Sequence, residues 1–177
     1  MKPPESVKTP RLILRRPVLE DASPIFEGYA RDPEVTRYLS WRPHESVERT
    51  QDFLRRCRDF WERNEAFPWV VVLKDEKRPI GMIDLRPQGN RVEIGYVLAR
   101  SFWGRGYMTE ASLVLIEWAL SQPGIWRVWA VCDVDNAASA RVLEKVGMVR
   151  EGILRRWIIH PNISAEPRAC YCYAVTK

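Results

Sequence analysis

The sequence EIGYVL at residues 93–98 is followed closely by WGRGYMTEA at residues 103–111. The first stretch is typical of a strand, and the second places a glycine turn directly before an apolar helical pattern. Further along, NAAS at residues 136–139 begins another helical pattern, which closes at KVG, residues 145–147. The resulting order is strand, glycine turn, helix, strand, capped helix. This order suits a ligand with a pyrophosphate at one end and a reactive group at the other.

The glycine turn is the clearest candidate for a phosphate site. Gly104 and Gly106 allow positive φ angles and a close approach of the backbone to a ligand. Free N–H groups at the start of the following helix, together with the helix dipole, favour phosphate. No Gly-Lys-Ser/Thr follows, so the turn is not a P-loop. A plain strand-to-helix turn without a ligand is the alternative.

The rest of the chain predicts a mixed sheet. We expect strands at residues 9–17, 69–73, 80–85, 91–98, 125–133, 148–159 and 168–175, and helices at 46–64, 107–121 and 136–147. Asp21 and Asp32 mark further helix starts, and residues 87–90 read as a turn. This order predicts an α/β fold of the α+β type, with helices on both faces of one mixed sheet.

Length and composition limit the class of protein. A chain of 177 residues with 46% apolar residues favours one ordered domain. We assign residues 1–8 to an N-terminal tail and residues 9–177 to the domain. No apolar run is long enough for a membrane span and residues 1–10 do not read as a secretory signal, so we expect a cytoplasmic protein.

The charged and metal-binding residues exclude other classes. A net charge of +5 is spread along the chain, and no motif for sequence-specific nucleic-acid binding is present. The 4 cysteines form no paired CxxC framework and there are only 2 histidines, so we expect no metal site.

These motifs, together with RLILR at residues 11–15, resemble the GNAT superfamily of N-acetyltransferases, in particular its RimJ/RimL-like branch of ribosomal-protein N-acetyltransferases. The resemblance covers residues 9–177 and implies a single-domain GNAT fold with splayed central strands. It also implies transfer of an acetyl group from acetyl-CoA to a primary amine by direct attack. The acceptor would be a ribosomal or other protein N-terminus, or a small amine. A catalytically degenerate acyl-CoA-binding module is the alternative.

The resemblance also implies which residues bind the co-substrate. The family's phosphate motif, Arg/Gln-x-x-Gly-x-Gly/Ala, aligns with residues 103–108, where Trp103 and Met108 depart from it. The backbone around Tyr96, Val97 and Leu98 would hold the pantetheine arm and the thioester carbonyl. Asn136 would bond the pantetheine arm. The pyrophosphate would be held by Gly104, Arg105, Gly106, Tyr107, Met108 and Thr109.

Two residues are candidates for proton transfer. Direct attack requires a neutral amine, and Glu93 is our first candidate for the general base; it shares a strand face with Gly95. It could instead only position the substrate. Many family members donate the thiol's proton from a tyrosine seven residues after the motif asparagine, where this chain has Leu143. The RimL-like pattern assigns this role to Ser139, unless Ser139 only caps or packs.

The acceptor side is less well defined. In some RimL-like enzymes, the strand that follows a Glu-Gly pair carries a carboxylate that serves as the general base. The matching pair here is Glu151-Gly152, and Arg155, Arg156 and Trp157 stand in that strand instead. If these side chains face the acceptor, it would carry an acidic or planar group; solvent-facing arginines are the alternative. His160, in the next loop, is another candidate base. The oligomeric state, monomer or homodimer, stays open.

Overall fold

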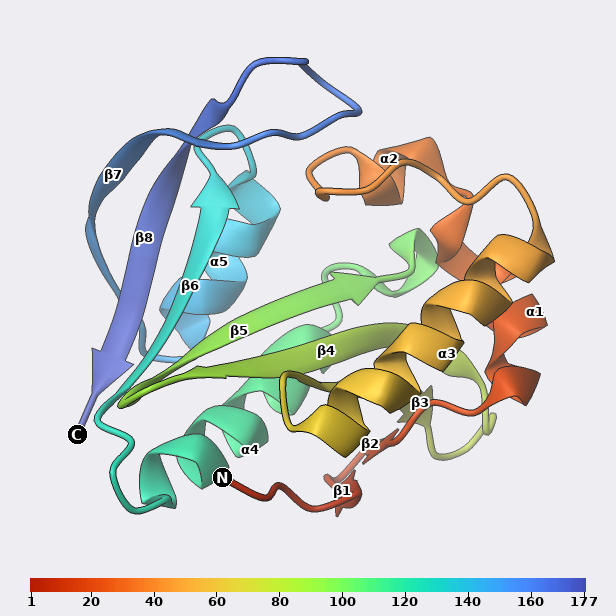
Figure 1. Ribbon diagram of the computed structural model, residues 1–177, viewed down its shortest axis with the longest axis horizontal. Coiled ribbons are helices and arrows are strands. Elements are labelled where there is room, and N and C mark those ends of the chain that lie inside the picture. The colour runs from red at the N-terminus through yellow and green to blue at the C-terminus, as the bar shows by residue number, and fades with distance from the viewer.

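The computed structural model describes residues 1–177 and shows one eight-stranded mixed sheet with helices on both faces (Figure 1). The strand order is β1-β2-β3-β4-β5-β6-β8-β7, and only β5 and β6 are parallel neighbours. The strands are β1 (Ser6–Lys8), β2 (Leu12–Arg15), β3 (Phe67–Leu73), β4 (Pro79–Gln88), β5 (Arg91–Leu98), β6 (Arg127–Asp133), β7 (Val149–Ile158) and β8 (Arg168–Thr176). The predicted mixed α/β architecture is confirmed.

Helices cover both faces of the sheet. They are α1 (Ala22–Ile25), α2 (Pro33–Thr36), α3 (Val47–Arg63), α4 (Tyr107–Ser121) and α5 (Ala137–Lys145), with short turns η1 (Leu19–Asp21), η2 (Phe26–Ala30) and η3 (Arg100–Phe102). In Figure 1, α1 and α3 lie in front of β3 and β4, whereas α4 and α5 lie behind the sheet. No helix has the length and apolar character needed to cross a membrane.

Local sequence signals explain where the long helices begin and end. The Ser46 side chain accepts a bond from the Arg49 N–H at the start of α3, and Asn64 ends that helix in a left-handed conformation. The Asn136 side chain accepts from the Ser139 N–H, 3.1 Å away, at the start of α5. Gly147 follows α5 with a φ of 82°. The caps at Asn136 and Gly147 of the predicted capped helix are therefore confirmed, and the structure adds a cap at Ser46.

Most strand boundaries shift by a few residues from the prediction, and two of the differences change how the sheet is built. Ser6–Lys8, which we assigned to the tail, pairs with β2 and adds an edge strand to the sheet. The turn predicted at residues 87–90 is shorter, because β4 and β5 pair through Gln88 and Arg91. Only Gly89 and Asn90 form the turn, and Gly89 has a φ of 65°. The tight turn fixes the register between β4 and β5.

The sheet opens between its two parallel strands. β5 pairs with β6 only from Arg91 to Glu93, although it stays paired with β4 as far as Leu98. Beyond Glu93, β6 diverges and continues alongside β8 to Asp133 (Figure 1). The predicted splay of the central strands is confirmed. It leaves part of the β5 backbone without a sheet partner on that side, available to a ligand.

Candidate active site

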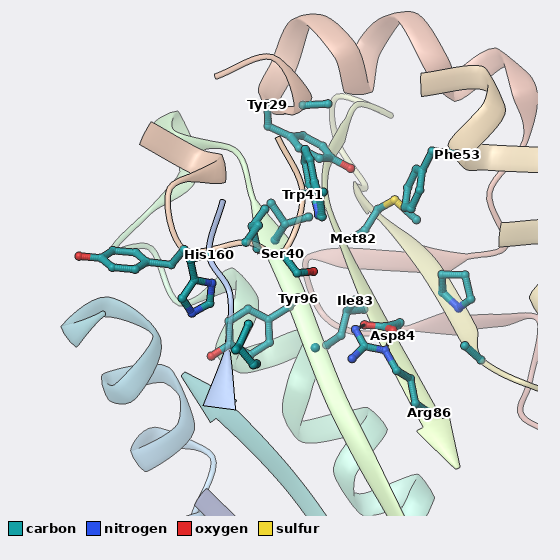
Figure 2. A pocket seen from close by; sticks show the side chains of 18 of the residues that line it. Tyr29, Ser40, Trp41, Phe53, Met82, Ile83, Asp84, Arg86, Tyr96 and His160 are labelled. Carbon is teal, nitrogen blue, oxygen red and sulfur yellow. Dashed lines mark hydrogen bonds and ion pairs between the residues drawn. The ribbon is translucent and has the colours of Figure 1, made fainter. Parts of the chain in front are cut away.

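A cavity of about 1160 Å³ extends from the opening between β5 and β6 to the space under α3. Its lining contains five predicted site residues, namely Glu93, Tyr96, Val97, Asn136 and Ser139. Aromatic side chains such as Trp41 and Phe53 also contribute, and Figure 2 shows them across the cavity from Tyr96 and His160. The splayed strands thus bring residues distant in sequence to one open cavity.

The predicted phosphate loop has the geometry of an anion site. Gly104 and Gly106 have φ angles of 74° and 76°, which L side chains rarely adopt. Gly106 is the N-cap of α4 and has no side chain that could accept a hydrogen bond from the N–H groups of the helix. The first turn of α4 therefore keeps free N–H donors for a phosphate. Trp103, which departs from the family motif, donates its indole N–H to the Leu98 carbonyl at 2.7 Å. It thereby holds the loop against the end of β5.

Arg11 lies at this loop, a placement that the sequence did not predict. Its Nη1 donates to the Arg105 carbonyl at 3.0 Å, and its Nε donates to Glu110 at 2.6 Å. Its guanidinium lies 4.3 Å from the centre of the Tyr107 ring. The guanidinium is therefore fixed beside the free N–H groups of α4, with its charge balanced by Glu110. The only available signal was the RLILR motif at residues 11–15.

A pair of hydroxyl groups lies on the α5 side of the cavity. The Tyr96 hydroxyl and Ser139 Oγ are 2.8 Å apart. Burial raises the pKa of Tyr96, although its bond to Ser139 opposes the rise. Leu143 is buried at the position where many family members have their tyrosine. In this chain a tyrosine hydroxyl reaches Ser139 from β5 instead, which the sequence did not reveal.

The opposite face of β5 carries a cluster of charges. Arg86 donates to Asp84 Oδ2 at 2.6 Å (Figure 2). Arg86 also donates to Glu93 Oε1 at 3.0 Å, and Gln88 donates to the other Glu93 oxygen at 3.2 Å. Burial raises the pKa of Asp84 despite the nearby Arg86. Gly95 makes the arrangement possible, because a Cβ there would lie 2.8 Å from Asp84 Oδ1. Both oxygens of the predicted base, Glu93, are thus occupied within the protein.

The three residues predicted to bind the acceptor lie elsewhere. Arg155, Arg156 and Trp157 are exposed on β7 and do not line the cavity. Arg156 has a φ of 50° and pairs with Glu166 at the surface. The wall near the end of β7 is formed instead by Ile158, His160 and Pro161.

No group of three or more His, Cys, Asp or Glu side chains is arranged to hold a metal ion. The cysteines are free, and Cys57, Cys132 and Cys170 are buried. Burial raises the pKa of both Cys57 and Cys132 to about 12. Thiolate chemistry is therefore disfavoured at neutral pH.

The family follows from comparison with known proteins. The model of the acetyltransferase (GNAT) domain matches residues 11–149. The uncharacterised N-acetyltransferase YoaA of Bacillus subtilis strain 168 is 33% identical over 174 residues, which cover 97% of this chain and 96% of YoaA. The crystal structure of a GNAT acetyltransferase from Bacillus anthracis superposes with a TM-score of 0.84 at 27% identity, covering 97% of this chain and 98% of the other.

A relative with a named substrate is the [ribosomal protein uS5]-alanine N-acetyltransferase of Escherichia coli K12. It is 24% identical over 166 residues, which cover 89% of this chain and 84% of that enzyme. The chain belongs to the GNAT family and resembles its RimJ/RimL-like members. The predicted enzyme class, N-acetyltransferase, is confirmed, as is acetyl-CoA as the co-substrate of this family.

Proposed function

We propose that this enzyme acetylates the α-amino group of a polypeptide by direct attack of the amine on acetyl-CoA. The observation that carries the proposal is the division of one cavity into two sides by β5. Glu93 and Gly95 face the Asp84–Arg86 pair, whereas Tyr96 faces α5 and bonds Ser139. A donor bound in the opening between β5 and β6 would thus be reachable from the opposite side by an acceptor.

The donor side fits acetyl-CoA, which supplies an activated acetyl thioester when bound. The free N–H groups of α4 and the nearby Arg11 suit the pyrophosphate. The unpaired edge of β5 beyond Glu93 suits the amide groups of the pantetheine arm, as does Asn136. The Ser139 and Tyr96 hydroxyls would lie near the thiol end, where Ser139 donates a proton or hydrogen bond to the leaving sulfur.

The acceptor side suits a cationic amine attached to a larger chain. The carboxylates of Asp84 and Glu93 attract an ammonium group, and the apolar surfaces of Trp41 and Phe53 can contact the residue that carries it. We infer that Glu93 positions the ammonium and does not act as the base that takes its proton. Both carboxylate oxygens of Glu93 already accept hydrogen bonds from Arg86 and Gln88. The relative named [ribosomal protein uS5]-alanine N-acetyltransferase supports a polypeptide acceptor.

An amine panel tests this proposal against a small-amine acceptor and a degenerate binding module. Release of free thiol from acetyl-CoA should be fastest with peptides that have a free N-terminus. The same peptides with a blocked N-terminus are the matched control and should give only background release. A rate confined to polyamines would overturn the polypeptide acceptor. Thermal stabilisation by CoA without thiol release from any amine would identify the degenerate module.

A further inference from the structure

His160 is a buried titratable side chain that the mechanism above does not use. Only 4% of its surface is exposed, and neither ring nitrogen has a hydrogen-bond partner within the protein. Buried polar atoms without a partner are rare because leaving one unpaired costs about 1–3 kcal/mol. His160 lines the same cavity as Glu93 and Ser139. The imidazole at this wall therefore has hydrogen-bonding capacity that the protein itself does not satisfy.

Asp133 lies next to the imidazole without a hydrogen bond to it. His160 Nε2 lies 3.5 Å from Asp133 Oδ2, and the Asp133 side chain is fully buried. Arg168 fixes that carboxylate with bonds of 2.6 and 3.0 Å. A carboxylate that faces Nε2 favours a proton on that nitrogen and leaves the Nδ1 lone pair free. Figure 2 shows the His160 ring at the cavity that Tyr96 also lines.

The surrounding chain keeps His160 in this position. Its carbonyl accepts from the backbone N–H groups of Ile163 and Ser164, which closes a turn directly after it. Asn162 in that turn donates to the carbonyls of Thr36 and Trp41 at 2.7 and 2.8 Å. The segment is thus tied to the chain that follows α2. Precise placement of this kind is needed for proton transfer.

The strand register places Asp133 on the acceptor side. Trp129 pairs with Glu93, so the two side chains share one face of the sheet. Alternation along β6 puts Asp133 on that same face and Cys132 on the other, towards Ser139. The other charged or titratable groups that face the imidazole region are Arg168, Asp135, which bonds Arg168, and Tyr38, whose ring lies edge-on 6.4 Å away.

We propose that His160, oriented by Asp133, is the general base that takes the proton from the acceptor ammonium; this inference rests on the proposed function. The neutral amine nitrogen then bonds the acetyl carbon as the carbon–sulfur bond breaks. Of the two protons lost by nitrogen, one leaves through His160 to solvent and one ends on the CoA sulfur, beside Ser139. An imidazole suits this task for an α-amino group, whose pKa of about 7.7–8.0 is far closer to neutral than that of lysine.

Kinetics of His160→Gln test the base directly. With a peptide acceptor, the rate at pH 7 should fall about 100- to 10,000-fold, and the rise of log kcat/KM with pH on the acid side should disappear. CoA affinity should stay at the wild-type value. His44→Gln is the matched control, because His44 lines the same cavity but has a hydrogen-bond partner, Thr50, at 2.8 Å. This control variant should keep the acid limb, that is, the rise of log kcat/KM with pH on the acid side. An acid limb that persists in His160→Gln and vanishes in Glu93→Gln would overturn the proposal.

A second measurement separates this inference from the proposed function. The chain has only 2 histidines, so ¹⁵N NMR of the imidazoles can be assigned with His44→Gln alone. The His160 signals should show the Nε2–H tautomer, with Nδ1 unprotonated, in the folded protein. Signals of the Nδ1–H tautomer would overturn the base role even if no acceptor is found. The Nε2–H tautomer without thiol release from any amine would count against the proposed function instead.

Discussion

Replacing Gly106 with alanine gives a test in which strain and ligand contact can be separated. Gly106 has a φ of 76°, where an L residue costs about 1–2 kcal/mol. The added Cβ would meet no protein atom closer than Arg11 Nη2, at an ordinary contact distance of 3.6 Å. The protein itself can therefore accommodate the methyl group, apart from the backbone strain. For a domain of this size, that strain should lower Tm by about 2–8 °C.

Gly124, just beyond the other end of α4, provides the matched control. It has a φ of 77°, and a Cβ there would meet nothing within 4 Å. Gly124→Ala should thus lose about as much stability as Gly106→Ala, through the same backbone strain and near the same helix. Only the Gly106 methyl lies at the free N–H groups proposed to bind the pyrophosphate.

The two variants should differ in their affinity for CoA. Loss of one hydrogen bond to a charged phosphate costs about 1.5–3 kcal/mol, which corresponds to an increase in Kd of roughly 10- to 100-fold. Isothermal titration calorimetry should show this increase for Gly106→Ala and a wild-type Kd for Gly124→Ala. If both variants keep the wild-type Kd, the loop does not hold the pyrophosphate. If both lose affinity equally, destabilisation of α4 is the cause and the contact argument is wrong.

Three further changes probe other parts of the site. Ser139→Ala should lower kcat about 10- to 100-fold with little change in CoA affinity, as steady-state kinetics and calorimetry would show; a loss of affinity alone would point to a binding role. Glu93→Gln should raise the KM for the peptide, because we propose that Glu93 positions the acceptor. The rise of log kcat/KM with pH on the acid side should stay at the same pH as in the wild type. A KM equal to that of the wild type would contradict the positioning role. Burial raises the pKa of Asp133, but its bonds from Arg168 and the Asp135 N–H outweigh burial and lower it overall. The stability contributed by the Asp133–Arg168 ion pair should therefore be complete above about pH 5. It should be lost as the pH falls through the pKa of Asp133 in the folded protein. Denaturant unfolding should show Arg168→Gln to be less stable by about 3 kcal/mol at pH 7, with a gap that narrows towards pH 3; a gap independent of pH would exclude this origin.

The features that the sequence predicted well depend on local chemistry. The bounds predicted for α4, residues 107–121, match the structure because a glycine turn starts the helix and Pro123 follows its end. The cap at Asn136 is likewise set by residues within a few positions. The splay between β5 and β6 came from the family resemblance rather than from any local signal.

The contacts that were missed join positions distant in sequence. Arg11 reaches Glu110 across 99 positions, and the Tyr96 hydroxyl reaches Ser139 across 43. The position of Asp84 opposite Gly95 depends on a two-residue turn at Gly89 and Asn90, whereas we expected a four-residue turn. A change in turn length alters which side chain lies across from Gly95. The acidic cluster around Glu93 could therefore not be deduced from the pattern of β5 alone.

His160 shows why residue type and local context are insufficient to find a catalytic base. In the sequence it precedes a proline in a polar loop, a setting typical of exposed side chains. It is buried because Asn162, two residues later, bonds backbone carbonyls 126 and 121 positions earlier in the chain. These bonds press the loop onto the chain after α2 and bring the imidazole to Asp133. If this tether creates the base, then Asn162→Ala should lower kcat and shift its pH dependence while Glu93 and Ser139 remain intact. A variant with lowered stability but an unchanged pH profile would show that the tether only supports the fold.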